Sequence, residues 1–166
     1  MPYTPAEDTY LTLESVEEVE EGDVCVDVGT GTCIVGMALA SKCRVTLAVD
    51  IDLNSCKMCK PPVDVVCSDV ANAVRRADVV VFNLPYLPPE EPTDAAVHDT
   101  GVVPRFLRWI SMVRPRVVVL TFSSLGRADF ILDALRAQCA VVRARKIHLF
   151  FETIYTVTAV CPKPRQ

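Results

Sequence analysis

The tetrapeptide Asn83-Leu84-Pro85-Tyr86 constrains the fold of this chain more than any other feature. It follows residues 78–82, an apolar run without helical period that predicts a buried strand. Open α/β sheets bind their ligands at the carboxyl ends of such strands. Leu84 precedes a proline, which favours an extended backbone, so its carbonyl can point the same way as the Asn83 side chain. Two carbonyl oxygens beside the Tyr86 ring form a receptor for a planar NH2 group. A plain turn is the alternative, because Asn and Pro favour turns.

A glycine loop supplies the second constraint. Residues 27–33 read Asp-Val-Gly-Thr-Gly-Thr-Cys, between a predicted strand at 24–28 and a predicted helix at 34–40. Glycines in this setting let the backbone approach a ligand closely. Ile34 stands where a dinucleotide fingerprint has its third glycine, which disfavours a dinucleotide. The next strand, 45–49, ends at Asp50, whose carboxylate can accept hydrogen bonds from ribose hydroxyls, with Asp52 as the alternative.

The bulk composition is that of a globular protein. The chain has 166 residues, of which 51% are hydrophobic and 23% are charged, and we expect a single domain over residues 1–166. The net charge of −4 counts against direct nucleic-acid binding, which usually leaves a basic footprint. Residues 1–10 lack the apolar segment of a signal peptide, and no run reaches membrane-spanning length. We therefore expect no membrane association and a cytoplasmic protein that could also enter the nucleus.

Eight cysteines occur in the chain, and with no secretory signal we expect them to be reduced. They are Cys25, Cys33, Cys43, Cys56, Cys59, Cys67, Cys139 and Cys161. Cys56 and Cys59 have the spacing of half a zinc site, but no second pair completes it. We therefore predict no metal site.

The strand predicted at residues 63–67 follows the second strand after only a short helix at 53–59, so it should lie at the sheet edge. It is apolar at Val63, Val65, Val66 and Cys67, with Asp64 as its only charge. Native edge strands are normally protected by charges, prolines or bulges. An interface for a partner protein and ordinary burial are equally good interpretations.

The remaining segments complete an α/β pattern. A helix capped by Asp8 or Thr9 should run to about Val19. Residues 87–101 form a proline-containing acidic loop of the kind that covers a site. Helices at 102–113 and within 124–138 flank a strand at 116–122. The strands at 140–150 and 153–160 are separated by two residues, too few for a crossover helix, so they form an antiparallel hairpin.

Together these elements resemble the class I, seven-stranded S-adenosylmethionine-dependent methyltransferases. That fold is a mostly parallel, Rossmann-like sheet with a C-terminal antiparallel hairpin and helices on both faces. Pro5-Ala6-Glu7-Asp8-Thr9, the glycine loop and Asn83-Leu84-Pro85-Tyr86 resemble the HemK-like release-factor glutamine methyltransferases of the eukaryotic and archaeal type. The resemblance implies a catalytic subunit that N5-methylates the glutamine of the Gly-Gly-Gln loop in a class 1 translation termination factor. It also implies S-adenosylmethionine as cofactor.

The resemblance also implies roles for individual residues. The cofactor would be held by Thr9, Asp27, Gly29, Gly31, Asp50, Asp69, Val70 and Asn83. Asp50 would take the ribose hydroxyls, and Asp69 the adenine amino group beside the Val70 backbone. Relatives act as heterodimers with a small zinc-binding activator protein, which we expect at residues 63–67. The family usually has proline where this chain has Leu84. Because a backbone carbonyl acts there, we expect activity to survive.

The receptor chemistry leaves two alternatives. Asn83 Oδ1 and the Leu84 carbonyl could accept both N–H bonds of a glutamine amide, with Tyr86 packed on its plane, and no general base is needed. The same receptor would suit a nucleic-acid adenine-N6 methyltransferase, which predicts a basic surface. A non-catalytic binding module that keeps only the fold is the other alternative.

Overall fold

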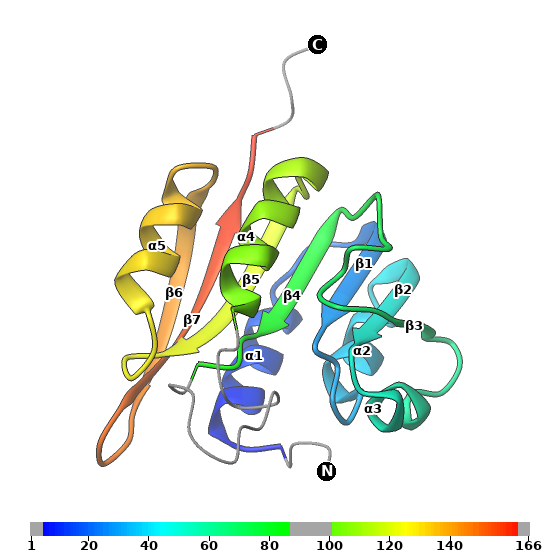
Figure 1. Cartoon of the computed structure of the whole chain (residues 1–166), viewed down its shortest axis with the longest axis horizontal. Coiled ribbons are helices and arrows are strands. Elements are labelled where there is room, and N and C mark those ends of the chain that lie inside the picture. The colour runs from blue at the N-terminus through cyan, green and yellow to red at the C-terminus, as the bar shows by residue number, and fades with distance from the viewer. Residues whose placement is uncertain (1–4, 87–100, 163–166) are drawn as a thin grey trace.

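The computed structural model describes residues 5–86 and 101–162 of the chain. Across these residues it forms one seven-stranded sheet flanked by five helices (Figure 1). The strands are β1 (Gly22–Val28), β2 (Cys43–Asp50), β3 (Asp64–Cys67), β4 (Val79–Asn83), β5 (Val117–Ser123), β6 (Ala140–His148) and β7 (Thr153–Val160). The helices are α1 (Glu7–Glu17), α2 (Ile34–Leu39), α3 (Leu53–Met58), α4 (Val102–Val113) and α5 (Ala128–Arg136).

The strand order is β3-β2-β1-β4-β5-β7-β6. The first five strands in this order are parallel, and β7 pairs antiparallel with both β5 and β6. The predicted sheet and its closing hairpin are therefore confirmed. Because β7 inserts between β5 and β6, the start of β7 meets the end of β5. The hairpin turn thus lies at the carboxyl edge of the parallel strands, at the lower left of Figure 1.

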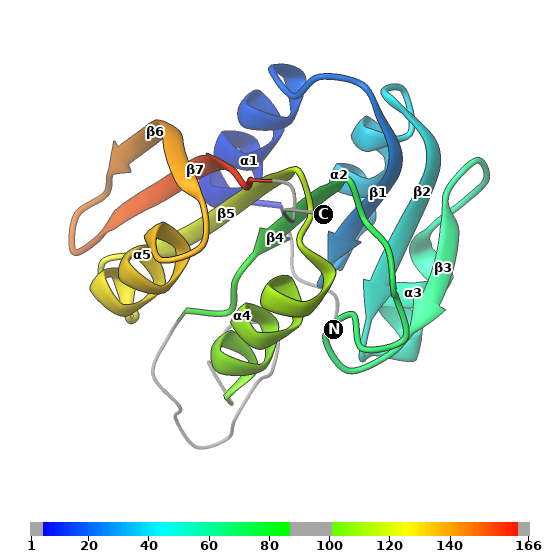
Figure 2. The same cartoon turned by 90° about the horizontal axis from the view of Figure 1, so that it is seen from above.

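Alternation along the central strands places a core on each face of the sheet. In β4, Val79 and Val81 pack with α1 and α2, whereas Val80 and Phe82 pack with α4 and α5. Figure 2 shows these two helix layers on opposite sides of the sheet. All seven residues of β5 are buried, which explains why its sequence is apolar except at Thr121 and Ser123. The helices and the sheet register together fix where each strand ends.

The amino end of α1 differs from the prediction. Neither Asp8 nor Thr9 caps the helix; the N-cap is Ala6, which makes no side-chain capping bond. Asp8 and Thr9 instead lie buried within the first turn. The Asp8 carboxylate accepts a hydrogen bond from a distant side chain, described below, and tertiary contact has therefore overridden the local capping preference.

The edge position of β3 is confirmed, because β2 is its sole strand neighbour in the described sheet. Val65 is 39% exposed, Cys67 is exposed and Val66 is half-buried. Val63 precedes the strand, and its side chain is buried in a small cluster with Cys33 and Ala48. We therefore leave Val63 out of the interface proposed below.

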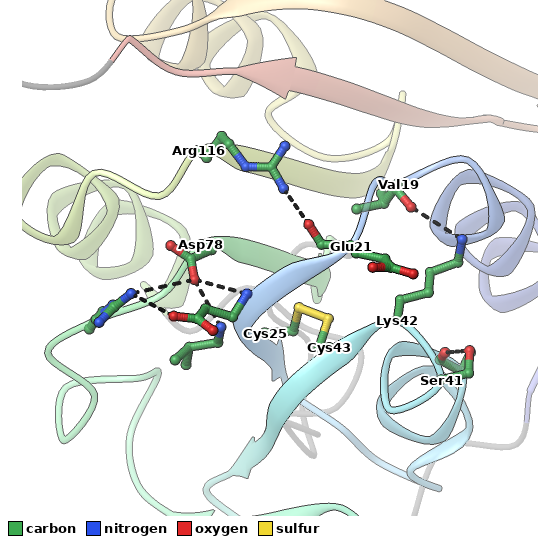
Figure 3. The surroundings of a disulfide bond; sticks show 12 residues. Val19, Glu21, Cys25, Ser41, Lys42, Cys43, Asp78 and Arg116 are labelled. Atoms are coloured by element: carbon green, nitrogen blue, oxygen red, sulfur yellow. Dashed lines mark hydrogen bonds and ion pairs between the residues drawn. A yellow bond between two sulfur atoms is a disulfide. The ribbon is translucent and has the colours of Figure 1, made fainter.

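The expectation of reduced cysteines is wrong for six of the eight thiols. Within the described residues, disulfides join Cys25 to Cys43, Cys33 to Cys59 and Cys139 to Cys161. Figure 3 shows the first of them bridging β1 and β2. The parallel register brings these strands together, with the two Cα atoms 6.0 Å apart, although the cysteines are 18 residues apart in sequence. Sequence spacing alone does not reveal this proximity.

Near the same disulfide, two cationic side chains donate hydrogen bonds to backbone carbonyls in the segment between α1 and β1. Lys42 Nζ donates to the carbonyl of Val19 at 3.1 Å, and Arg116 donates to the carbonyl of Glu21 at 3.0 Å (Figure 3). These contacts tie the chain between α1 and β1 to the amino-terminal edge of the sheet. The opposite, carboxyl edge is left for ligands.

Cys56 and Cys67 are the two free cysteines among the described residues. Burial and the neighbouring Cys67 thiol raise the pKa of the Cys56 thiol to about 11, so this thiol is not activated. Since Cys59 is bonded to Cys33, the Cys56–Cys59 pair is not available as half a zinc site. The loop at 87–101, for which a covering role was predicted, lies outside the described residues except for Gly101. In the part of the chain that the structure describes, no helix could span a membrane.

Candidate active site

The predicted site residues gather at the carboxyl edge of four neighbouring strands. Each strand delivers part of the set: β1 the glycine loop, β2 Asp50, β3 the loop with Asp69 and Val70, and β4 Asn83. Thr9 and Asp8 reach the same edge from α1, which packs beside β4 and β5. The topology therefore brings together residues that lie up to 75 positions apart in sequence.

Asn83 occupies the centre of this edge, and its amide orientation is fixed. Its Nδ2 donates to Asp8 Oδ2 at 2.9 Å. Its Oδ1 is buried and has no hydrogen-bond partner among the described residues. A buried acceptor without a partner costs about 1–3 kcal/mol, so such atoms are rare in folded proteins. The side chain thus presents an unsatisfied carbonyl oxygen, as an NH2 receptor requires.

The helix that carries Asp8 is anchored by a buried chain of hydroxyl groups. Thr12 Oγ1 donates to the Asp8 carbonyl at 2.7 Å and lies 2.6 Å from Thr121 Oγ1, which lies 2.7 Å from Thr156 Oγ1. These contacts join α1 to β5 and β7 directly beneath Asp8. Threonines in strands are common, so no local sequence signal identified this ladder.

Leu84 uses both its backbone and its side chain. Its N–H donates to the Thr121 carbonyl at 2.9 Å, which extends the β4–β5 pairing by one hydrogen bond. Its side chain is buried in the core on the α4 side of the sheet. Proline has no N–H and could not make this bond. Leucine in place of the expected proline therefore adds a backbone contact without placing a new side chain in the site.

Tyr86 closes the motif against a glycine that was not predicted as functional. A Cβ added to Gly126 would lie 2.7 Å from the Tyr86 carbonyl oxygen and 3.1 Å from its Cβ. No side chain at position 126 can be accommodated without moving the tyrosine. The sequence signal is Gly126 itself, the single glycine that follows β5.

The charges of three carboxylates act on the Tyr86 hydroxyl. Burial raises the pKa of Tyr86, and the charges of Asp8, Glu152 and Glu7 raise it further. Glu152 is held in place by a hydrogen bond from Ser123 at the end of β5. Tyr86 is therefore neutral over the physiological pH range and stands in a negative electrostatic field.

The glycine loop has the backbone conformation that its sequence predicted. Gly29 and Gly31 have positive φ values of 66° and 52°, a region that side chains disfavour. A Cβ on Gly29 would also lie 2.8 Å from the Phe82 ring. At Gly31 a Cβ would meet nothing within 4 Å, so this part of the loop faces open space that a ligand can enter.

Asp27 lies beneath the loop and does not face that open space. Its buried carboxylate accepts a hydrogen bond from Thr30 Oγ1 at 2.6 Å and one from the Gly36 backbone N–H. Burial raises the pKa of Asp27 to about 7, although the two hydrogen bonds oppose the shift. The structure therefore gives Asp27 the task of shaping the loop from below.

Asp50 stands at the end of β2 and holds the other side of the loop. Its Oδ2 accepts from the Gly31 N–H at 2.9 Å, and its Oδ1 accepts from the Asp52 N–H at 2.9 Å. Each carboxylate oxygen retains a further lone pair for a hydroxyl donor. The alternative ribose ligand, Asp52, caps α3 by accepting from the N–H groups of Asn54 and Ser55. Asp50 is thus the better placed of the two.

Asp69 and Val70 follow β3. Asp69 forms an ion pair with Arg105 of α4 at 3.2 Å, a partner that sequence reasoning missed. Val70 adopts a positive φ of 53°, unusual for a β-branched residue and therefore strained. Strained backbone of this kind concentrates at ligand sites. No group of three or more potential metal ligands occurs within residues 5–86 and 101–162.

Comparison with known proteins agrees with this geometry. No model of a protein family matches the chain. A Methanocaldococcus jannaschii protein, MJ0928, provisionally named as a protein N5-glutamine methyltransferase, is 32% identical over 98 residues, covering 54% of this chain and 49% of that protein. The human methyltransferase HEMK2 is 30% identical over 110 residues, covering 54% of this chain and 51% of HEMK2. The chain spans about half the length of these relatives.

Solved structures share the whole fold. The E. cuniculi Mtq2–Trm112 complex, described as responsible for methylating the eRF1 termination factor, contains a chain with a TM-score of 0.75 at 23% identity, covering 96% of this chain and 98% of that one. The N-methyltransferase NodS from Bradyrhizobium japonicum, solved with S-adenosyl-L-homocysteine, gives 0.67 at 12% identity over 94% of this chain and 86% of NodS. The chain is therefore similar in sequence, over about half its length, to proteins named as glutamine methyltransferases, and it shares the fold of solved methyltransferases.

Proposed function

We propose that this chain is the catalytic subunit of an S-adenosylmethionine-dependent protein methyltransferase. Its substrate would be the glutamine of the Gly-Gly-Gln loop in a class 1 translation termination factor, methylated on N5. The observation that carries the proposal is the orientation of Asn83. Asp8 holds Nδ2, so Oδ1 remains as a buried acceptor without a partner among the described residues. A glutamine NH2 group would satisfy it.

An amide nitrogen is a poor nucleophile because its lone pair is delocalised into the carbonyl. The task of the site is therefore mainly alignment, which can contribute several kcal/mol when the reacting atoms are held in line. Asn83 Oδ1 would accept one N–H of the glutamine and the Leu84 carbonyl the other. Tyr86 would pack against the plane of the amide.

The negative charges near Tyr86 would favour methyl transfer, because the glutamine amide nitrogen becomes positively charged as it accepts the methyl group. The carboxylates of Asp8, Glu152 and Glu7 raise the pKa of Tyr86, and the same field stabilises positive charge at the neighbouring receptor. The amide nitrogen carries a positive charge once it has accepted the methyl group, and in that state it loses a proton readily to water. No base with a tuned pKa is therefore needed. Tyr86 itself remains neutral and contributes packing only.

The residues of the glycine loop fit the proposed cofactor. S-adenosylmethionine supplies a methyl group bound to a positively charged sulfur. Gly31 faces open space, and Asp50 retains lone pairs for two ribose hydroxyls. Asp69 would accept from the adenine amino group beside Val70, and Thr9 lies next to Asp8 on the first turn of α1. Asp27 would support the loop from beneath.

The Asp69–Arg105 ion pair adds one requirement. Both side chains are about two-fifths exposed, so the pair is weak and can be rearranged. Adenine would have to share Asp69 with Arg105 or displace it. Arg105 thereby becomes a candidate contact for the adenine ring, which the motif-based assignment did not include.

We further propose that β3 binds a small activator protein in a heterodimer. An edge strand offers unpaired N–H and C=O groups, and here Val65 and Cys67 add exposed apolar surface beside it. The complex of the structurally similar Mtq2 with Trm112 supports this assignment. We place the enzyme in the cytoplasm, where translation terminates. An adenine-N6 substrate is disfavoured, because the carboxylates around Tyr86 would repel a phosphate backbone.

Methyl transfer to a recombinant termination factor tests the proposal. The chain, co-expressed with its activator, should add one methyl group to the Gly-Gly-Gln glutamine, as located by peptide mass spectrometry. The same factor with that glutamine changed to asparagine should receive none. Transfer that persists on the changed factor, or that goes only to RNA or DNA, would contradict the proposal.

A further inference from the structure

Two phenylalanines form the tip of the β6–β7 hairpin and are not used by the core. Phe150 is 101% exposed and Phe151 is 92% exposed, with ring centroids 6.4 Å apart. Leaving a phenylalanine in water forgoes the stabilisation that burial of its ring would give. Adjacent aromatic rings at full exposure are typical of a contact surface for another molecule.

The hairpin tip is held rigidly at its base. The Leu149 N–H donates to the Glu152 carbonyl at 2.8 Å, and His148 Nδ1 lies 2.9 Å from Thr153 Oγ1. Thr153 and Ser124 exchange two hydrogen bonds: the Thr153 N–H donates to Ser124 Oγ and the Ser124 N–H donates to the Thr153 carbonyl, both at 2.9 Å. The tip is therefore fixed to the segment that follows β5.

That segment is also the one that supports the receptor motif. Ser123 at the end of β5 donates to Glu152, and Gly126 packs against Tyr86. Glu152, the residue next to Phe151, is close enough to Tyr86 to raise its pKa. In Figure 1 the hairpin turn and the end of β4 lie along the same lower edge of the sheet. The hairpin tip thus lies at the same edge of the sheet as the receptor, and the segment after β5 connects the two.

We propose that Phe150 and Phe151 are docking anchors for the protein substrate, and that they bind an apolar surface of the termination factor beside its Gly-Gly-Gln loop. This proposal rests on the proposed function. The receptor contacts only a side-chain amide, which every glutamine carries, so it cannot by itself select one protein. Selection needs contacts outside the reacting group, and exposed aromatic anchors are the residues that most often supply them.

The charges near the tip favour a protein over a nucleic acid. Bases can stack on exposed aromatic rings, but single-strand binders combine such rings with a positive groove. Here the charges of Asp8, Glu152 and Glu7 raise the pKa of Tyr86, so the receptor that the tip adjoins stands in a negative field. They would repel phosphates and would tolerate a neutral or basic polypeptide.

Steady-state methyl transfer to the intact termination factor tests the proposal. The variant is the double substitution Phe150→Ser with Phe151→Ser, in the full chain co-expressed with its activator. We expect the KM for the factor to rise at least about tenfold, because each lost anchor weakens binding several-fold. The kcat at saturation and the Kd for S-adenosylmethionine should stay unchanged, since neither ring touches the receptor or the glycine loop.

Val142→Ser is the matched control. Val142 is 59% exposed on the same hairpin, but it lies near the start of β6, at the opposite edge of the sheet. Its removal should leave KM, kcat and melting temperature unchanged, which separates docking from general effects of a more polar hairpin.

Three results would overturn the proposal: an unchanged KM in the double variant, loss of the activator from the variant complex, or a drop in oligomeric state that shows the tip to be a self-association contact. Protection of the two rings by RNA and not by the factor would overturn it as well. A wild-type complex that fails to methylate the factor refutes the proposed function. A wild-type complex that methylates it with the same KM as the double variant refutes the docking surface alone.

Discussion

Asn83 and Asp8 lie 75 residues apart in sequence and are joined by a 2.9 Å hydrogen bond from Nδ2 to Oδ2. This bond determines which end of the Asn83 amide faces the substrate. With Nδ2 directed at a carboxylate, Oδ1 must point the other way, where it lacks a partner among the described residues. The first turn of α1 is thus part of the candidate active site, although it lies far from the β4 motif in sequence.

Asp8→Ala should therefore impair catalysis. Without Asp8, the Asn83 amide can flip and offer its NH2 to the target, so kcat should fall on the order of 10–100-fold through lost alignment. Asp8→Asn should retain more activity, because its amide oxygen can still accept from Nδ2. The measurement is steady-state methyl transfer, with S-adenosylmethionine binding and thermal unfolding followed in parallel.

Glu7→Ala is the control for this change. Glu7 is an exposed carboxylate in the same helical turn, and its removal lowers the local negative charge by the same amount. It makes no contact with Asn83 among the described side chains, so kcat should change little. Equal losses in the two variants would show that Asp8 acts through charge and not through orientation.

Asp27 should make the stability of the protein depend on pH. Its folded-state pKa of about 7 lies above its ordinary value of 3.8, mainly because of burial. Below pH 4 the carboxyl is protonated in both states and carries no penalty. As pH rises from 4 to 7 the unfolded chain releases the proton more readily, so the free energy of unfolding falls, by up to about 4 kcal/mol in total. Above pH 7 the loss is complete.

Urea denaturation at pH 5, 6, 7 and 8 measures this effect, and Asp27→Asn removes the titrating group. The difference in unfolding free energy between wild type and variant should shift in favour of the variant as pH rises from 5 to 7, and it should level off toward pH 8. Asp50, whose charge also raises the Asp27 pKa, is retained in both proteins and cancels in the comparison. Parallel pH profiles would mean that the Asp27 carboxyl titrates normally in the folded state.

The cysteines should divide into two free and six bonded thiols. Alkylation of the unfolded, unreduced protein should modify only Cys56 and Cys67, and prior reduction should make all eight reactive. Each disulfide contributes about 2–4 kcal/mol, so full reduction should lower the melting temperature by more than about 10 °C. Alkylation of all eight residues without reductant would show that the bonds do not form in the cell from which the protein is purified.

The sequence predicted the strands well, and the site less completely, for physical reasons. Strands β4 and β5 each begin with at least four consecutive apolar residues, next to prolines and charges, so their position and their ligand-binding ends followed from local pattern. The cysteine pairs, the Thr12–Thr121 contact and the Asp69–Arg105 ion pair depend on which elements become neighbours. Local pattern also misassigned Asp8 as a helix cap, because the sequence does not reveal that Asp8 and Asn83 become neighbours in the fold.

The exposed face of β3 should be required for stable assembly. The chain expressed alone should aggregate, and co-expression of the activator should restore a soluble heterodimer. Val65→Lys places a charge on the exposed strand and should abolish co-purification of the activator without unfolding the chain, because edge strands tolerate lysine. Met112→Lys is the control, since Met112 is an exposed residue on α4. A soluble, fully active monomer would contradict the assignment.

Leu84→Pro tests whether the receptor depends on backbone or on side chain at this position. The change removes the N–H that donates to the Thr121 carbonyl at 2.9 Å and part of a side chain that is buried in the core. The lost hydrogen bond should cost about 0.5–1.5 kcal/mol, and the smaller side chain should add to that. The carbonyl of residue 84 is retained, so kcat should remain within a few-fold of wild type.

Leu84→Ala separates the two contributions. It keeps the hydrogen bond from the residue 84 N–H and removes most of the side chain, so it should destabilise the protein by about 2–5 kcal/mol. This cost exceeds the part of the Leu84→Pro effect that comes from the lost hydrogen bond. Thermal and urea unfolding report the stability of each variant, and steady-state transfer reports kcat. If Leu84→Pro abolished transfer while both variants remained folded at the assay temperature, the receptor would need the leucine side chain or its N–H, and the backbone-carbonyl account would fail.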